Sequence, residues 1–131
     1  MLDHYRFSLI FTAAIGCGLI AGVFFAFSTF VMSALARLQP TQGIVAMQSV
    51  NITAVNPLFM LTLFGTAVDC VFLSIMVLLK WNQASIAYWL VGSLLYLVGT
   101  VGVTIAFNAP LNDALASAKA ELDGLDSVYF R

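Results

Sequence analysis

Charged side chains are scarce in this chain. Only 8% of its 131 residues are Asp, Glu, Lys or Arg, and 62% are hydrophobic. A typical soluble domain carries about 25% charged residues. A small soluble domain has too much surface to cover for an apolar core to explain this deficit. The composition therefore argues against a soluble domain, and the absence of any basic run argues against nucleic-acid binding.

Cysteine and histidine are almost absent as well. The two cysteines, Cys17 and Cys70, lie inside apolar runs without a Cys-X-X-Cys partner, so we interpret them as small core residues rather than a disulfide. The only histidine, His4, has no clustered cysteines or carboxylates around it in the sequence. We therefore predict that this chain alone builds no metal or haem site.

What the chain has in abundance is long apolar runs. Three of them, roughly 7–35, 57–79 and 84–107, are long enough to cross a bilayer, which takes about 20 helical residues. Backbone groups in lipid must be hydrogen-bonded within the segment, so these runs are expected to be helices. The sequence predicts an all-α, polytopic membrane helical bundle with three transmembrane helices, whose principal partner is the lipid bilayer.

Few charges are available to orient this bundle. Arg6 and Lys80 fall on one side of the predicted membrane and Arg37 on the other, so the positive-inside rule favours a cytoplasmic N-terminus, in a bacterial inner membrane. Aromatic residues near the ends of the second and third spans read as an interfacial belt: Trp81, Tyr88 and Trp89. Three consecutive spans also place Arg37 and Asn108 on the same side, whichever way the protein inserts.

Shorter patterns predict further local structure. The loop after the first span contains a short helix over about 41–54, with Thr41 as its N-cap. Small residues let membrane helices approach closely, so we expect two glycine pairs to serve packing within the chain. These pairs are Gly18 with Gly22, and Gly92 with Gly99.

The second span carries one acid, Asp69, near its middle, on the same helical face as Thr62 and Thr66. A carboxylate there costs at least about 2.5 kcal/mol, so this side chain must be neutral, hydrated or hydrogen-bonded. Tyr96 lies at similar depth in the third span, and we predict that its hydroxyl donates to Asp69. A proton relay or substrate contact and a purely structural hydrogen bond remain equally open for this intramembrane acid.

Polar side chains gather where spans end on the Arg37 side of the membrane. The residues are Ser33, Arg37, Gln42, Gln48, Asn51, Asn56, Asn108, Asn112 and Asp113. Arg37 and Asp113 are predicted to form an ion pair across this layer. Asn108-Ala109-Pro110 is expected to end the third helix, because the residue before proline disfavours helix. These side chains either form a site or only cap helix ends.

The spaced motifs resemble a known family. They are residues 22–28 (Gly-Val-Phe-Phe-Ala-Phe-Ser), Arg37, Asn56-Pro57-Leu58 and residues 108–113 (Asn-Ala-Pro-Leu-Asn-Asp). Over about 9–120 the chain is similar to small multi-pass membrane proteins that include the anthrone oxygenases. The resemblance implies a four-helix bundle and, for the oxygenases, oxidation of anthrones to anthraquinones by O2 without metal or flavin. It therefore implies no cofactor.

Residue chemistry suggests roles for the polar cluster in such a reaction. The oxidation needs a base, donors for an enolate oxygen and an apolar slot for the rings. We predict Asp113 as the base or its orienting group, with Arg37, Asn56 and Asn108 as donors. Asn51 and Asn112 are further candidates for substrate binding. Phenylalanines of the first span are candidates for the slot, although core packing or lipid contact is the more common role of such residues: Phe24, Phe25, Phe27 and Phe30.

The C-terminal segment departs from the family pattern. Residues 114–131 are polar and amphipathic, so the expected fourth span is missing and the chain reads as a truncated product or fragment. A second copy of the chain or lipid would then cover the unfilled face of the bundle. The leading functional reading is an oxygenase acting on an apolar aromatic small molecule. A non-catalytic membrane subunit or partner-binding protein is the alternative, and a small transporter ranks third because three spans without inverted repeats suit alternating access poorly.

Overall fold

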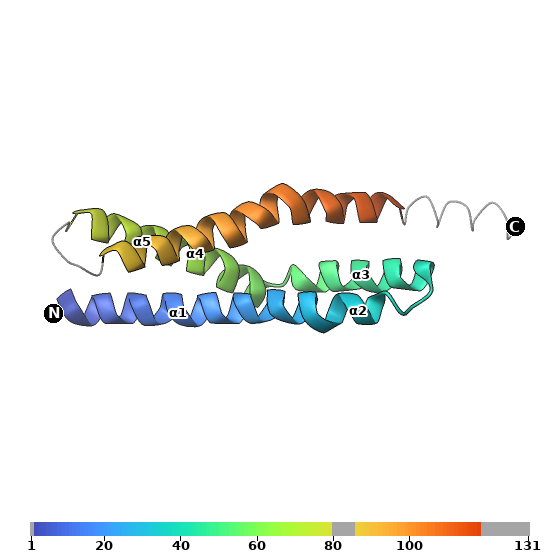
Figure 1. Cartoon of the computed structure of the whole chain (residues 1–131), viewed down its shortest axis with the longest axis horizontal. Helices are drawn as coiled ribbons and strands as arrows, with labels where there is room; N and C mark the ends of the chain where they lie inside the picture. Colours follow the sequence, from blue (N-terminus) through green and yellow to red (C-terminus); the bar gives the residue numbers. More distant parts are fainter. Residues whose placement is uncertain (1, 80–85, 119–131) are drawn as a thin grey trace, which may run out of the picture.

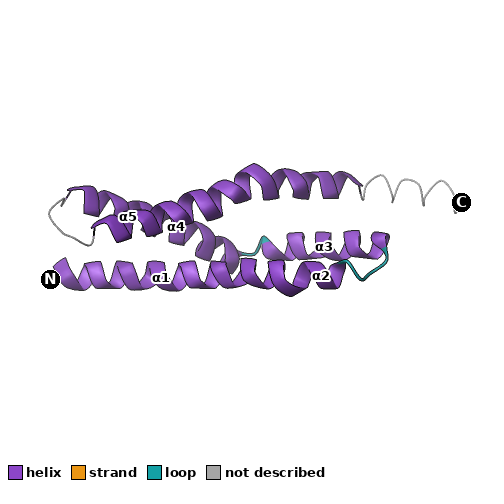
Figure 2. Cartoon of the chain, in the orientation of Figure 1, coloured by secondary structure: helices purple, strands orange, loops and turns teal. Residues whose placement is uncertain are grey.

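The computed structural model describes residues 2–79 and 86–118 (Figures 1 and 2). All of these residues are helical except two short connections at 36–39 and 55–56. The elements are α1 (Leu2–Ala26), the π-helix η1 (Phe27–Val31), α2 (Met32–Leu35), α3 (Pro40–Ala54), α4 (Pro57–Leu79), α5 (Ile86–Leu94) and the π-helices η2 (Leu95–Gly102) and η3 (Thr104–Asn108). α1, η1 and α2 form one continuous first helix. α5, η2, η3 and the helical residues 109–118 form a continuous third helix.

The chain runs back and forth along one axis (Figure 1). The first helix runs the length of the molecule, α3 returns beside its end, α4 continues away from α3, and the third helix runs back again. Three helices are long and apolar enough to cross a membrane: His4–Leu35, Pro57–Leu79 and Ile86–Ala118. This confirms the predicted all-α membrane helical bundle with three spans. The segment 119–131 lies outside the described residues.

The third helix does not stop where the sequence predicted. It continues from Asn108 through Pro110 to residue 118, so the predicted end at 107 is wrong. Proline removes one N–H donor and its ring clashes with the carbonyl four residues earlier. The backbone accommodates this by widening into η3 just before Pro110, where the Ala109 N–H bonds to the Thr104 carbonyl five residues back.

Local side-chain bonds accompany the other irregular positions. In η1 the Thr29 hydroxyl donates to the Phe25 carbonyl at 2.7 Å, the acceptor that an α-helical Thr29 N–H would use.

α3 begins at Pro40, one residue before the predicted start, with Gln39 at the N-cap and no side-chain cap. The predicted capping role of Thr41 is therefore wrong, because Pro40 occupies the first helical turn, where its missing N–H costs nothing.

The core is a narrow seam where α1, α4 and the third helix meet. Its buried members are Ile20, Leu63, Cys70 and Tyr96, with Cys17 and Phe24 among the partly buried residues packed against them. Gly16 lies against Thr66, where a Cβ at position 16 would collide with the Thr66 hydroxyl oxygen. α1 and α4 therefore approach closely at a glycine that the predicted pairs did not include.

The predicted glycine pairs do not pack within the chain. A Cβ added at any of four glycines would meet no atom of the described residues within 4 Å: Gly18, Gly22, Gly92 and Gly99. These positions lie on the outer faces of α1 and the third helix, while the seam is built from the opposite faces. The prediction failed because several helical faces of an apolar span carry small residues, and spacing alone does not say which face is buried.

The aromatic residues at the opposite end of the molecule from Arg37 differ in environment. Tyr88 is 82% exposed, as expected of a belt residue. Trp89 is half-buried and, with Arg6 and Leu73 among others, lines a small cavity of about 20 Å³. Lys80 and Trp81 lie outside the described residues. The aromatic belt therefore stays a prediction at Trp81, whereas Trp89 contributes to packing between the helix ends.

Candidate functional site

Two hydrogen bonds join α3 to the last turns of the third helix. The Asn51 amide donates to Asn112 Oδ1 at 3.0 Å, and the Gln48 amide donates to the Leu115 carbonyl at 2.7 Å. Gln48 and Asn51 are three residues apart on α3, and Asn112 and Leu115 are three residues apart on the third helix. Both bonds therefore lie on one face of α3 and one face of the 109–118 segment. We call Gln48, Asn51 and Asn112 the amide layer. The sequence predicted Asn51 and Asn112 as site residues, and the structure brings them together.

The amide layer is largely enclosed. Gln48 is only 7% exposed, while Asn51 and Asn112 are half-buried. The Leu115 carbonyl can only accept, so the Gln48 atom that faces it must be the amino group. The Gln48 carbonyl oxygen is shielded from solvent and has no partner among the described residues. The layer thus contains acceptor and donor capacity beyond its two hydrogen bonds.

Asp113 and Asn108 flank this layer on the third helix. Asp113 directly follows Asn112 and is exposed, and its backbone carbonyl accepts from the Ser117 hydroxyl at 3.0 Å. Asn108 ends η3, one helical turn before Asn112, and is half-buried. A carboxylate and three asparagines therefore occur within a short stretch of the molecule. Of the predicted cluster, the fold joins Asn51 to Asn112, and Asn108 and Asp113 lie near that pair along the third helix.

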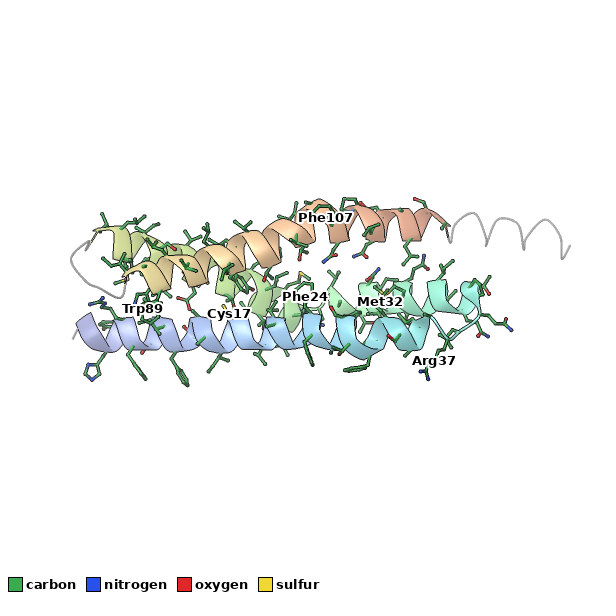
Figure 3. All side chains as sticks on the ribbon, viewed as in Figure 1. Cys17, Phe24, Met32, Arg37, Trp89 and Phe107 are labelled. Carbon is green, nitrogen blue, oxygen red and sulfur yellow. The ribbon has the colours of Figure 1, made fainter. Side chains whose placement is uncertain are left out.

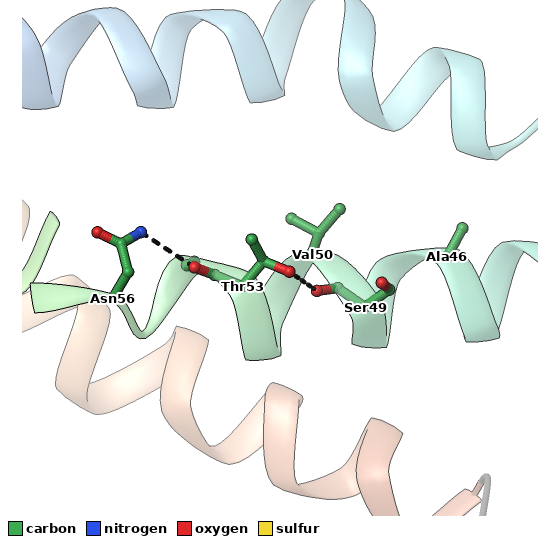
Figure 4. Close-up of a pocket in the computed structure, with 6 residues that line it drawn as sticks. Ala46, Ser49, Val50, Thr53 and Asn56 are labelled. Carbon is green, nitrogen blue, oxygen red and sulfur yellow. Dashed lines mark hydrogen bonds between the residues drawn. The ribbon is translucent and has the colours of Figure 1, made fainter. Parts of the chain in front are cut away.

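Arg37 and Asn56 do not join that group. Arg37 is exposed and points away from the helix that carries Asp113 (Figure 3), and the described residues contain no ion pair between the two. The predicted Arg37–Asp113 ion pair is therefore wrong. Asn56 caps α4, accepting from the Phe59 N–H at 2.9 Å and donating to the Thr53 carbonyl at 3.0 Å (Figure 4). Both the donor and the acceptor end of its amide are therefore engaged at the α3–α4 junction.

A shallow groove runs along another side of α3. It has a volume of about 520 Å³ and is lined by Ala46, Ser49, Val50, Thr53, Ala54 and Asn56 (Figure 4). Ala46 and Val50 point toward the side on which the first helix lies. The side chains that line the groove are mainly small and apolar, with two hydroxyls and one amide among them. The groove therefore offers a mostly apolar surface beside α3 rather than a set of reactive groups.

The phenylalanines of the first helix separate into two groups. Phe24 packs against the core cluster and Phe27 is half-buried in η1. Phe25 and Phe30 are 70% and 61% exposed. Phe25 and Phe30 thus face outward, where lipid would surround them. Phe24 and Phe27 are the two that remain available to an apolar slot within the bundle.

A second polar group lies inside the membrane-spanning part of the bundle. The Thr12 hydroxyl of α1 lies 2.7 Å from Asp69 Oδ2 of α4. Tyr96 is buried, and its hydroxyl donates to the Leu63 carbonyl at 2.9 Å, so the predicted Tyr96–Asp69 hydrogen bond is wrong. Tyr96 lies in η2 and bonds to the face of α4 that meets the third helix, whereas Asp69 lies on the side of α4 that meets α1.

Sequence reasoning missed Thr12 as the partner of Asp69. Thr12 lies in the first span and its hydroxyl also lies 3.0 Å from the Ser8 and Leu9 carbonyls. Span counting indicates this partner, because the first and second spans are antiparallel and place Thr12 and Asp69 at comparable depth. The described residues contain no group of three or more His, Cys, Asp or Glu side chains arranged to hold a metal ion.

Comparison with known proteins identifies the family. A profile of the family described as anthrone oxygenase matches residues 56–128. This chain belongs to the anthrone oxygenase family. The match covers α4, the third helix and the candidate residues Asn56, Asn108, Asn112 and Asp113. No curated protein and no solved structure matches the chain.

Proposed function

We propose that this chain is a membrane-embedded oxygenase that uses O2 to oxidise an apolar, enolisable aromatic substrate of the anthrone type. The observation that carries the proposal is the family match over 56–128, because this region holds Asp113 and the asparagines beside it. We also propose that the protein lies in a bacterial inner membrane with its N-terminus in the cytoplasm, on the basis of Arg6 and Lys80.

The overall change converts the CH2 group of the anthrone, which lies across the central ring from the ketone and is conjugated to it through the aromatic rings, with one O2, into a carbonyl group and one water. The Asp113 carboxylate takes the first proton from the CH2 group and leaves an enolate. The enolate gives one electron to O2, and the resulting carbon radical and superoxide combine into a peroxide. Proton return to the peroxide and loss of the second C–H proton then release water and form the new carbonyl. No other oxidant is required.

The residues around Asp113 supply the remaining functions in this proposal. Amide N–H groups of Asn51, Asn108 and Asn112 hold the enolate oxygen as it gains charge. Asp113 is exposed while Asn108 and Asn112 are half-buried, so the base is the most accessible of these groups. Phe24 and Phe27 offer apolar surface for the rings. Arg37 and Asn56 stay candidate donors from the sequence, engaged elsewhere in this conformation.

The test is oxygen uptake and quinone formation by the purified protein in lipid vesicles supplied with anthrone. We expect Asp113→Asn to lower the rate by about 100-fold or more, since general-base groups typically contribute that much. Ser117→Ala is the matched control on the same helix, because among the described residues its hydroxyl bonds only to the Asp113 backbone carbonyl. Arg37→Gln tests whether the arginine takes part. No uptake above the protein-free rate by folded wild type would remove the proposal for this substrate.

A second candidate function is a non-catalytic membrane subunit that binds another protein or a second copy of this chain. The observation that favours it is that Asn51 and Asn112 bond to each other and Asn56 caps α4. In this reading the amides serve only to hold the helices in place. In that case Asp113→Asn leaves every property of the folded protein unchanged, and the wild type co-purifies with its partner in mild detergent.

A further inference from the structure

The Thr12–Asp69 contact is a side chain to side chain hydrogen bond between α1 and α4, and it involves the acid that the proposed oxidation leaves unused. Asp69 is half-buried in the middle of α4. Its second oxygen, Oδ1, is shielded from solvent and has no hydrogen-bond partner among the described residues. One oxygen of the carboxyl group is therefore hydrogen-bonded and the other is not, and both lie in an apolar surrounding.

An ionised carboxylate fits this surrounding poorly. It would carry a full charge inside a membrane span, and one of its two charged oxygens would be enclosed without a donor. The thiols of Cys17 on α1 and Cys70 on α4 lie near Asp69, and a thiol brings no positive charge. The hydroxyl of Tyr96 on the third helix is committed to the Leu63 carbonyl.

A neutral carboxyl group fits better. If Oδ2 carries the proton, it donates to the Thr12 oxygen across the 2.7 Å contact. The Thr12 proton is then free to go to the Ser8 or Leu9 carbonyl, each 3.0 Å away. Both hydroxyl protons have acceptors in this arrangement. The unbonded Oδ1 is then a neutral carbonyl oxygen, which is less costly to enclose than half of a carboxylate.

We propose that Asp69 is an intramembrane proton-binding site, in which the carboxyl group carries a proton and donates it to Thr12, fastening α1 to α4. The ligand is a proton, and the site is separate from the amide layer and independent of the proposed oxidation. The hydrogen bond lies one turn from Gly16 and Thr66, where the two helices are too close for a Cβ at position 16. Close packing and the shared proton therefore act at the same level of the seam.

The experiment is infrared spectroscopy of the purified chain in lipid at pH 7. We expect the wild type to show the carbonyl stretching band of a protonated carboxyl group, Asp69→Asn to lack it and Asp113→Asn to keep it. Thr12→Val should shift the band, because the acid loses its acceptor. Thr62→Val is the matched control, since the Thr62 hydroxyl bonds only to Leu58 in its own helix.

A stability measurement separates this role from simple packing. An asparagine at position 69 retains a donor to Thr12, so Asp69→Asn should unfold at nearly the wild-type temperature, while Thr12→Val should unfold at a lower one. If Asp69→Asn does not fold, the spectra of Thr12→Val and Thr62→Val still test the proposal, because both variants keep Asp69. A wild-type spectrum with only ionised carboxylate bands, or a band that Thr12→Val leaves unmoved, would overturn the proposal.

Discussion

Single glycines show most clearly how the seam between α1 and α4 is built. Gly16 is buried beside Thr66, and any side chain at this position would meet the Thr66 hydroxyl. Gly18 lies two residues further along the same helix and faces open space. In a membrane, where association depends on close packing, such a difference between neighbouring glycines should be measurable.

Substitution of these two glycines gives a matched prediction. Gly16→Ala should destabilise the protein by about 1–3 kcal/mol, the usual cost of inserting a methyl group into a filled contact. Gly18→Ala should leave stability nearly unchanged, because its Cβ meets nothing. Thermal or denaturant unfolding in one detergent measures both. Equal effects of the two substitutions would contradict the proximity of Gly16 to Thr66.

At the scale of elements, the third helix shows how a membrane helix continues through a proline. Asn-Ala-Pro was predicted to end this helix, yet the backbone widens into η3 and continues. A π-turn contains one more residue than an α-turn and so rotates every following residue about the helix axis. This rotation sets which face of the 109–118 segment meets α3, and with it the bond between Asn51 and Asn112.

Replacing the proline should therefore disturb the amide layer from a distance. Pro110→Ala restores the missing N–H, which favours a regular α-helix and turns Asn112 away from Asn51. The measurement is oxidative cross-linking of an Asn51→Cys, Asn112→Cys pair in a chain whose native cysteines are replaced by serine. We expect efficient cross-linking with Pro110 and a several-fold lower yield with Pro110→Ala. An unchanged yield would mean that the proline does not set the register.

For the whole molecule, helix length is the informative quantity. The membrane-compatible stretches of the first and third helices have 32 and 33 residues. At about 1.5 Å per residue they measure roughly 50 Å, well beyond a hydrocarbon core of about 30 Å. α4, with 23 residues, matches the membrane more closely. The α3 end of the bundle, which includes the amide layer, should therefore stand at or beyond the membrane surface.

Labelling with a water-soluble maleimide tests this arrangement. In a chain without Cys17 and Cys70, Gln42→Cys on α3 should react readily and Ser74→Cys within α4 should not. In intact cells Gln42→Cys should react from outside and Ser8→Cys only after lysis, if the N-terminus is cytoplasmic. Equal labelling of positions 42 and 74 would place α3 inside the hydrocarbon region, and the reverse sidedness would invert the orientation.

The sequence by itself determined the helical membrane class, the first two spans and the residue types that gather at the Arg37 end. It could do so because run length and the need for internal backbone bonds in lipid leave little other choice. Only the tertiary structure decided which polar groups meet. It paired Asn51 with Asn112 and Asp69 with Thr12, turned Arg37 away from Asp113 and selected Gly16 over Gly18. Those outcomes depend on helix rotation and on the π-turns, which spacing along the chain does not encode.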